Sequence, residues 1–167
     1  MSRSSLRDPY RTVIQRFNRH GVRYVVIGMA GINYYAQGPA QAFATMDYDI
    51  FVEPTLGNVE EAAQCLERLG FTVATAEQLL TPEGIRAVVR ERRTIVATTP
   101  DGLMIELLLR VSGYAFADLA RDAAIFTVRG VPVKVGRLTK LTRSKKLAGR
   151  PKDRQFLRRY QAQLEEQ

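Results

Sequence analysis

Asp47 and Asp49 stand two residues apart at the start of an apolar run that continues to Val52. The β-branched and aromatic residues of this run predict a strand, and side chains two apart on a strand point to the same face. Two carboxylates held side by side repel each other unless a cation lies between them or water screens them. The chain must therefore place this pair either at a cation site or on a solvent-facing edge strand.

A third carboxylate, Glu106, interrupts the otherwise apolar run 103–109. An acid in such a strand is rarely buried without a partner, and it can face the aspartate pair if the two strands are neighbours. Ile105 and Leu107 then point to the opposite face, which helices must cover. Three carboxylates on adjacent strands suit Mg²⁺, commonly as two ions that clamp the attacking and leaving oxygens of a phosphoryl transfer. The alternative is that Glu106 points outward from a half-exposed strand.

The remaining periodicities predict an α/β (α+β) fold, with a mixed β-sheet flanked by helices. Two pairs of strands are expected to form hairpins, around 100–102 and 129–130. We expect one domain over 1–167, with a mixed-sheet core at 1–136 and basic helices at 137–167. The expected strands are 22–27, 47–52, 71–73, 94–98, 104–109, 125–128 and 131–135. The expected helices are 7–19, 32–36, a segment from Pro54 to Gly70, 78–92, 116–121, 138–147 and 151–164.

Positive charge is concentrated at the C-terminal end of the chain. The net charge is +8, and residues 137–167 hold 10 Lys and Arg against 3 Asp and Glu. Such a segment favours either an anionic partner or a solvated helical surface. The two helices also carry apolar residues that can dock them on the core rather than leave a free arm: Leu138, Leu141, Leu147, Phe156, Leu157 and Tyr160.

Composition excludes several other classes of protein. A hydrophobic fraction of 46% excludes wholesale disorder, and a single cysteine, Cys65, excludes a disulfide scaffold. No apolar run reaches membrane-spanning length and the N-terminus has no signal-peptide core, so we expect a cytoplasmic protein with no membrane partner. Cys65 is expected in the core and His20, the only histidine, at a helix end. Structural zinc is excluded for lack of ligands.

The order of motifs along the chain resembles that of the polymerase-β-like nucleotidyltransferase superfamily. A strand at 22–27 runs into a Gly28-Met29 turn and a short helix, and a loop ending in Thr45 leads to the paired aspartates. More specifically, the chain resembles the small bacterial group related to the AbiE-type toxin of toxin–antitoxin systems. Members of that group often carry an A-G-R-P-K-D stretch after a lysine-bearing helix, as residues 148–153 do here. The resemblance covers roughly Tyr24 to Tyr160.

The resemblance implies a Mg²⁺-dependent enzyme that transfers a nucleoside monophosphate from a nucleoside triphosphate (NTP) to an acceptor hydroxyl. The acceptor would be tRNA or other RNA, protein or a small molecule, and an antitoxin protein would be a further partner. Metal binding and catalysis would fall to Asp47, Asp49 and Glu106. The implied nucleotide-binding residues are Gly28, Met29, Thr45, Lys145 and Lys146.

Two positions depart from the pattern of the family. Met29 replaces the second Gly or Ser of the turn, and Phe43 replaces an arginine two residues before Thr45. A methionine offers no hydroxyl to phosphate, and the loss of a guanidinium removes a bidentate contact. We therefore expect an active enzyme with unusual phosphate handling or an unusual donor.

Two other functions remain open from the residues alone. A non-catalytic nucleic-acid-binding module on the same fold would use the basic helices for phosphate contacts and would not need Mg²⁺. A plain interaction protein would keep Asp47 and Asp49 solvated and would show no Mg²⁺-linked thermal shift.

Overall fold

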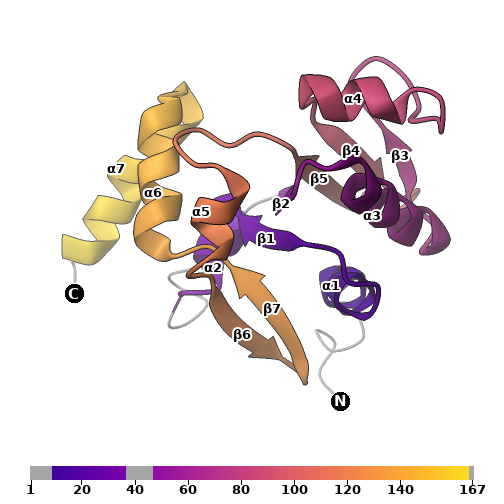
Figure 1. The fold of residues 1–167 in the computed structure, drawn as a ribbon. Coiled ribbons are helices and arrows are strands. Elements are labelled where there is room, and N and C mark those ends of the chain that lie inside the picture. The colour runs from indigo at the N-terminus through magenta and orange to yellow at the C-terminus, as the bar shows by residue number, and fades with distance from the viewer. Residues whose placement is uncertain (1–8, 37–46, 166–167) are drawn as a thin grey trace.

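The computed structural model describes residues 9–36 and 47–165, which form one mixed sheet with helices packed on it. Figure 1 shows the arrangement. The strands are β1 Tyr24–Ile27, β2 Asp47–Val52, β3 Thr72–Ala74, β4 Ile95–Thr98, β5 Met104–Leu108, β6 Ala124–Val128 and β7 Val131–Val135. The helices are α1 Pro9–Arg19, α2 Gly28–Asn33, α3 Leu56–Arg68, α4 Ile85–Glu91, α5 Phe116–Ala120, α6 Leu138–Ala148 and α7 Pro151–Glu165.

The sheet has the strand order β3-β4-β5-β2-β1-β7-β6. Its centre is the parallel pair of β2 with β5 and the antiparallel pair of β1 with β2, whereas β1 pairs parallel with β7. The hairpins β4–β5 and β6–β7 extend the sheet on either side. The predicted mixed sheet flanked by helices is confirmed. The strands of Asp47 and Glu106 are neighbours, which is the condition under which Glu106 can face the aspartate pair.

The two faces of β2 contact different helices. Tyr48 stacks on Tyr10 of α1 with ring centroids 4.3 Å apart, whereas Phe51 meets Phe116 of α5 edge to face at 5.4 Å. Since side chains alternate along a strand, Asp49 lies on the Phe51 face. In Figure 1, α5, α6 and α7 lie together on one side, and α1 and α3 lie on the other.

The Tyr48 face of the central strands is apolar. Ile105 and Leu107 of β5 are fully buried beside Ile50 of β2, as the alternation around Glu106 predicted. This packing anchors both acid-bearing strands from behind. The carboxylates on the opposite face are therefore held by strands that are buried on their other side.

Two predicted helices have different bounds in the structure. The helix expected at 32–36 begins at Gly28 directly after β1, because the φ of +67° at Gly28 turns the chain within one residue. The helix expected at 78–92 forms only at Ile85–Glu91. Before it, the chain turns back on itself, with the Leu80 amide donating to the Val73 carbonyl oxygen at 3.0 Å.

The basic C-terminal helices dock on the core as predicted. Leu141 of α6 and Phe156 of α7 are each only 3% exposed. Leu138, Leu157 and Tyr160 are partly buried against the same core. Leu147, near the end of α6 and beside Gly113, is an exception at 54% exposed. None of the described helices is both long and apolar enough to cross a membrane.

Candidate active site

The parallel pairing of β2 with β5 brings the predicted acids onto one face at the centre of the sheet. Asp47 lies opposite Met104, and Asp49 lies directly opposite Glu106. On the other side of β2, the antiparallel pairing with β1 places Ile27 opposite Asp49. Neighbouring residues in register share a face of the sheet, so Asp49 and Glu106 project together.

Asp49 of β2 lies beside the junction at which β1 ends and α2 begins. A Cβ atom added at Gly28 would stand 2.6 Å from Oδ2 of Asp49, and Gly28 also has a positive φ. Glycine is therefore required here both for its conformation and for the room that it leaves to the carboxylate. This close approach gives a physical reason for a glycine at the first position of the predicted turn.

Burial and like charges make the Asp49 carboxylate costly to ionise. Its Oδ1 atom is buried and has no hydrogen-bond partner among the described residues. Burial is the largest cause that raises the pKa of Asp49 to about 7, and the charges of Glu106 and Asp47 raise it further. Lys145 and Lys152 act in the opposite direction but do not cancel these effects. A bound cation would relieve both the burial and the repulsion.

A cavity of about 300 Å³ opens beside Asp49. Ile27, Gly28 and Asp49 form one wall, and the C-terminal end of β5 and the inner face of α6 form the others. The cations in its lining are Arg110, Lys145 and Arg150, accompanied by the hydroxyl-bearing Ser112 and Ser144. An acid at one wall and cations at the others suit a ligand that carries phosphate with bound divalent metal.

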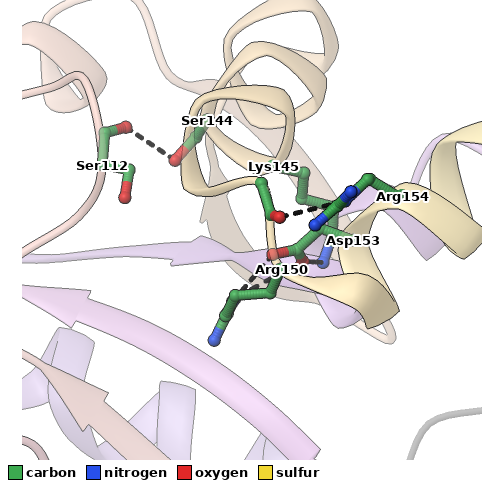
Figure 2. A network of polar contacts seen from close by, with 7 residues as sticks. Ser112, Ser144, Lys145, Arg150, Asp153 and Arg154 are labelled. Carbon is green, nitrogen blue, oxygen red and sulfur yellow. Dashed lines mark hydrogen bonds and ion pairs between the residues drawn. The ribbon is translucent and has the colours of Figure 1, made fainter.

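A buried aspartate holds two of these cations in place (Figure 2). Asp153 of α7 is 0% exposed, and its Oδ2 accepts a hydrogen bond from Arg150 Nε at 2.7 Å. Lys145 Nζ lies 3.4 Å from Oδ1 of the same carboxylate and 5.1 Å from the ring centre of Phe156. Burial by itself would raise the pKa of Asp153, but the hydrogen bonds and charges of Arg150 and Lys145 lower it overall.

A hydrogen bond ties the loop after β5 to α6. The Ser144 hydroxyl donates to the Ser112 carbonyl oxygen at 2.8 Å, as Figure 2 also shows. Both residues line the cavity. The wall that carries Lys145 is therefore fastened to the loop that follows the strand of Glu106.

The remaining predicted residues lie in different places. Met29 is partly buried against the core, and Lys146 is exposed; neither belongs to the lining of the cavity. Thr45 lies outside the described residues, as does Phe43. The structure thus brings Gly28, Asp49 and Lys145 together around one cavity.

The three carboxylates share a face without forming a closed cluster. Among the residues that the structure describes, the trio of potential ligands within 4.8 Å of one another is found elsewhere, at His20, Glu61 and Cys65. Asp47, Asp49 and Glu106 are spread more widely than that. An open set of oxygens leaves coordination positions to water and phosphate, which is how Mg²⁺ is usually held. The unpartnered Oδ1 of Asp49 and this all-oxygen donor set fit Mg²⁺.

Sequence reasoning did not identify Asp153 or Arg110 as members of the site. A signal for Asp153 was present, because it precedes Phe156 by three residues and Leu157 by four, on the apolar face of its helix. An acid on a docking face needs a buried cation. Arg110 carries a weaker signal, since it directly follows the strand of Glu106.

Comparisons with known proteins give distant likenesses only. No protein-family model matches the chain, and no curated protein matches it. JHP933 from Helicobacter pylori is a solved structure with a TM-score of 0.42 and 12% identity, covering 87% of this chain and 57% of that one. A presumed nucleotidyltransferase from H. pylori has a TM-score of 0.44 and 11% identity, covering 87% and 59%. This chain therefore spans less than two thirds of either neighbour.

Proposed function

We propose that this protein is a nucleotidyltransferase of the polymerase-β-like class, which moves a nucleoside monophosphate from an NTP to an acceptor hydroxyl. Within that class, we propose the small bacterial AbiE-toxin-like group, on the resemblance of residues 148–153 to its C-terminal stretch. The observation that carries the proposal is the pairing of Asp49 with Glu106 across β2 and β5, next to a cavity that Asp49 lines together with the cations Arg110, Lys145 and Arg150.

Asp47, Asp49 and Glu106 would hold Mg²⁺, which supplies positive charge where negative charge develops on the reacting phosphate. Lys145, Arg110 and Arg150 line the cavity and would bind the triphosphate oxygens. The Ser112 and Ser144 pair holds the α6 wall against the loop after β5, which fixes the position of these cations. The chain's contribution is then mainly to position the donor and to neutralise its charge.

The proposed reaction is an in-line displacement at the α-phosphorus. The acceptor oxygen forms a bond to that phosphorus while the bond to the bridging oxygen breaks and pyrophosphate leaves. The hydroxyl proton passes to solvent or to a carboxylate of the site. Because the donor is a tetraanion, the cations around the cavity and the metal-binding acids are both needed.

The acceptor would approach over the basic helices. Exposed cations on α6 and α7 include Arg143, Lys146, Lys152, Arg154 and Arg158. Their charge favours an anionic acceptor such as tRNA or other RNA, and phosphate contacts of this kind weaken steeply with salt. An antitoxin partner, inferred only from the resemblance, would be expected to cover this face or the cavity.

The test is incubation of the protein with Mg²⁺ and each labelled NTP, with and without total RNA. We expect label on RNA or protein, and we expect Asp49→Asn and Glu106→Gln to abolish it. Asp101→Asn, which alters an exposed acid in the turn between β4 and β5, is the matched control and should retain transfer. If the wild type binds RNA in a salt-dependent manner but transfers no label with any NTP, the protein is instead a non-catalytic nucleic-acid-binding module.

A further inference from the structure

The only histidine and the only cysteine of the chain meet on the side of the sheet away from the cavity. Glu61 joins them, and one ligand atom from each of the three residues lies within 4.8 Å of the other two. His20 directly follows α1, whereas Glu61 and Cys65 belong to α3. None of the three has a role in the proposed transferase site.

Local geometry explains why these side chains converge. Glu61 and Cys65 are four residues apart on α3, so they lie on one face of that helix. The His20 amide still donates to the Arg16 carbonyl oxygen at 3.0 Å, which extends the last turn of α1. Gly21, with a φ of +68°, then turns the chain away, and His20 Nδ1 lies 3.1 Å from Glu61 Oε1.

An ion pair alone does not account for the cluster. His20 and Glu61 are partly exposed, at 31% and 36% of their side chains, and such pairs add little stability. Cys65 is 0% exposed and stands on the inner side of the pair. The group thus runs from a buried thiol to a solvent-accessible imidazole and carboxylate, which leaves an open direction for a further ligand.

We propose that His20, Glu61 and Cys65 form a Zn²⁺ site with three protein ligands and one position for water. Nitrogen, oxygen and sulfur ligands with one open position form a known class of Zn²⁺ coordination. Bond lengths of 2.0–2.3 Å in a tetrahedron place ligand atoms about 3.5 Å apart, so a contraction of the cluster by about 1 Å suffices. The sequence alone offers no zinc-ligand pattern, whereas the packing of α1 near α3 brings these three potential ligands together.

Binding requires that the thiol lose its proton to solvent as the bond from Sγ to zinc forms. Burial and the Glu61 charge raise the pKa of Cys65, while Arg68 and Arg16 lower it. The zinc ion replaces the thiol proton, so binding releases one proton to solvent. Since the ligands come from two helices, the bound ion would fasten the end of α1 to α3 and raise the melting temperature.

The experiment uses Co²⁺ as a spectroscopic probe in the full-length protein. Because Cys65 is the only thiol, a sulfur-to-cobalt charge-transfer band in the near ultraviolet would report coordination at this residue and nowhere else. We expect one equivalent of Co²⁺ to give this band together with tetrahedral visible bands, and Zn²⁺ to displace it. The acidic site beside the cavity has no thiol and would give no such band.

Variants connect the signal to the three residues. We expect Cys65→Ala to abolish the charge-transfer band, and His20→Asn and Glu61→Gln each to weaken Co²⁺ binding by more than the roughly 10-fold to 100-fold that the loss of an outer-shell partner costs. Glu60→Gln, which alters the adjacent acid of α3, is the matched control and should leave binding unchanged. Circular dichroism checks that each variant is folded, and the exposed His20 gives a variant that leaves the core intact.

Three results would overturn the site. The first is the absence of a charge-transfer band at any Co²⁺ concentration up to saturation. The second is a band that persists at full affinity in both His20→Asn and Glu61→Gln. The third is a Zn²⁺-induced rise in melting temperature that Asp49→Asn removes and His20→Asn does not, because zinc then binds only at the acidic site. All three measurements are independent of nucleotide transfer, so the transferase proposal can fail without affecting this one.

Discussion

Asp49 and Glu106 lie directly opposite each other on the parallel strands β2 and β5, and Oδ1 of Asp49 is buried without a hydrogen-bond partner among the described residues. Two acids placed in this way reduce the stability of the fold unless something positive lies between them. The fold is therefore less stable at this site until a cation binds between the two carboxylates.

Asp49→Asn should stabilise the metal-free protein. Because the pKa of Asp49 is raised from 3.8 to about 7, ionisation of this carboxyl at high pH lowers the free energy of unfolding. In EDTA at pH 8, we expect denaturant unfolding to give a free energy about 1–3 kcal/mol higher for the variant. The wild type should lose stability as the pH rises from about 4 to about 7, so the difference should grow across this window. A variant less stable than wild type at pH 8 would contradict this account.

Gly28→Ala should impair the site because the added methyl group would clash with the Asp49 carboxylate. The added Cβ would lie 2.6 Å from Oδ2, at a residue whose φ is +67°. We expect a stability loss of about 1–2 kcal/mol together with loss of Mg²⁺-dependent thermal stabilisation. Gly57→Ala is the control, because nothing lies within 4 Å of its Cβ position in α3, and it should be neutral or slightly stabilising. An unaltered Mg²⁺ response in Gly28→Ala would show that the close approach has no functional role.

Lys145→Gln and Lys146→Gln should differ sharply. Lys145 lines the cavity with Asp49, whereas Lys146 is exposed and lies outside that lining. We expect Lys145→Gln to reduce kcat/KM for NTP by about 10-fold to 100-fold and Lys146→Gln to change it less than about 3-fold. The measurement is the initial rate of label transfer at varied NTP concentration. Equal effects of the two variants would mean that the tail acts only through its total charge.

Asp153→Asn should destabilise the C-terminal helices. Its carboxylate is fully buried between Arg150 and Lys145, and removing one partner of a buried ionic group leaves the others uncompensated. We expect a loss of about 2–4 kcal/mol, measured by thermal and denaturant unfolding. Arg158→Gln, an exposed change on α7, should cost less than about 0.5 kcal/mol.

The contribution of Asp153 to the stability of the fold should depend on pH with the opposite sign to that of Asp49. The pKa of Asp153 is lowered from 3.8 in the folded state. Its contribution is therefore present above its ordinary pKa and is lost as the pH falls below about 4. The stability difference between wild type and Asp153→Asn should narrow in acid, and a constant difference down to pH 3 would argue against the ionic pairing.

The sequence by itself determined most elements of the fold and which residues carry carboxylates on the acidic face of the sheet. Alternation around Glu106 required Ile105 and Leu107 to be covered, and both are fully buried in the structure. Strand and helix periodicities are local properties, so the bounds of β2 could be read directly. The prediction for the segment before α4 was wrong, because a turn that pairs with β3 takes the place of the expected helix.

Only the tertiary structure decided which distant residues meet. The parallel register sets Asp49 opposite Glu106 on another strand. Asp153 is enclosed by Lys145 and Arg150 across the junction between α6 and α7. His20 meets Cys65 from a different helix. Helix and strand patterns specify which face of an element is buried, but they do not specify its neighbour. That choice depends on packing of the whole core, which is a non-local property of the chain.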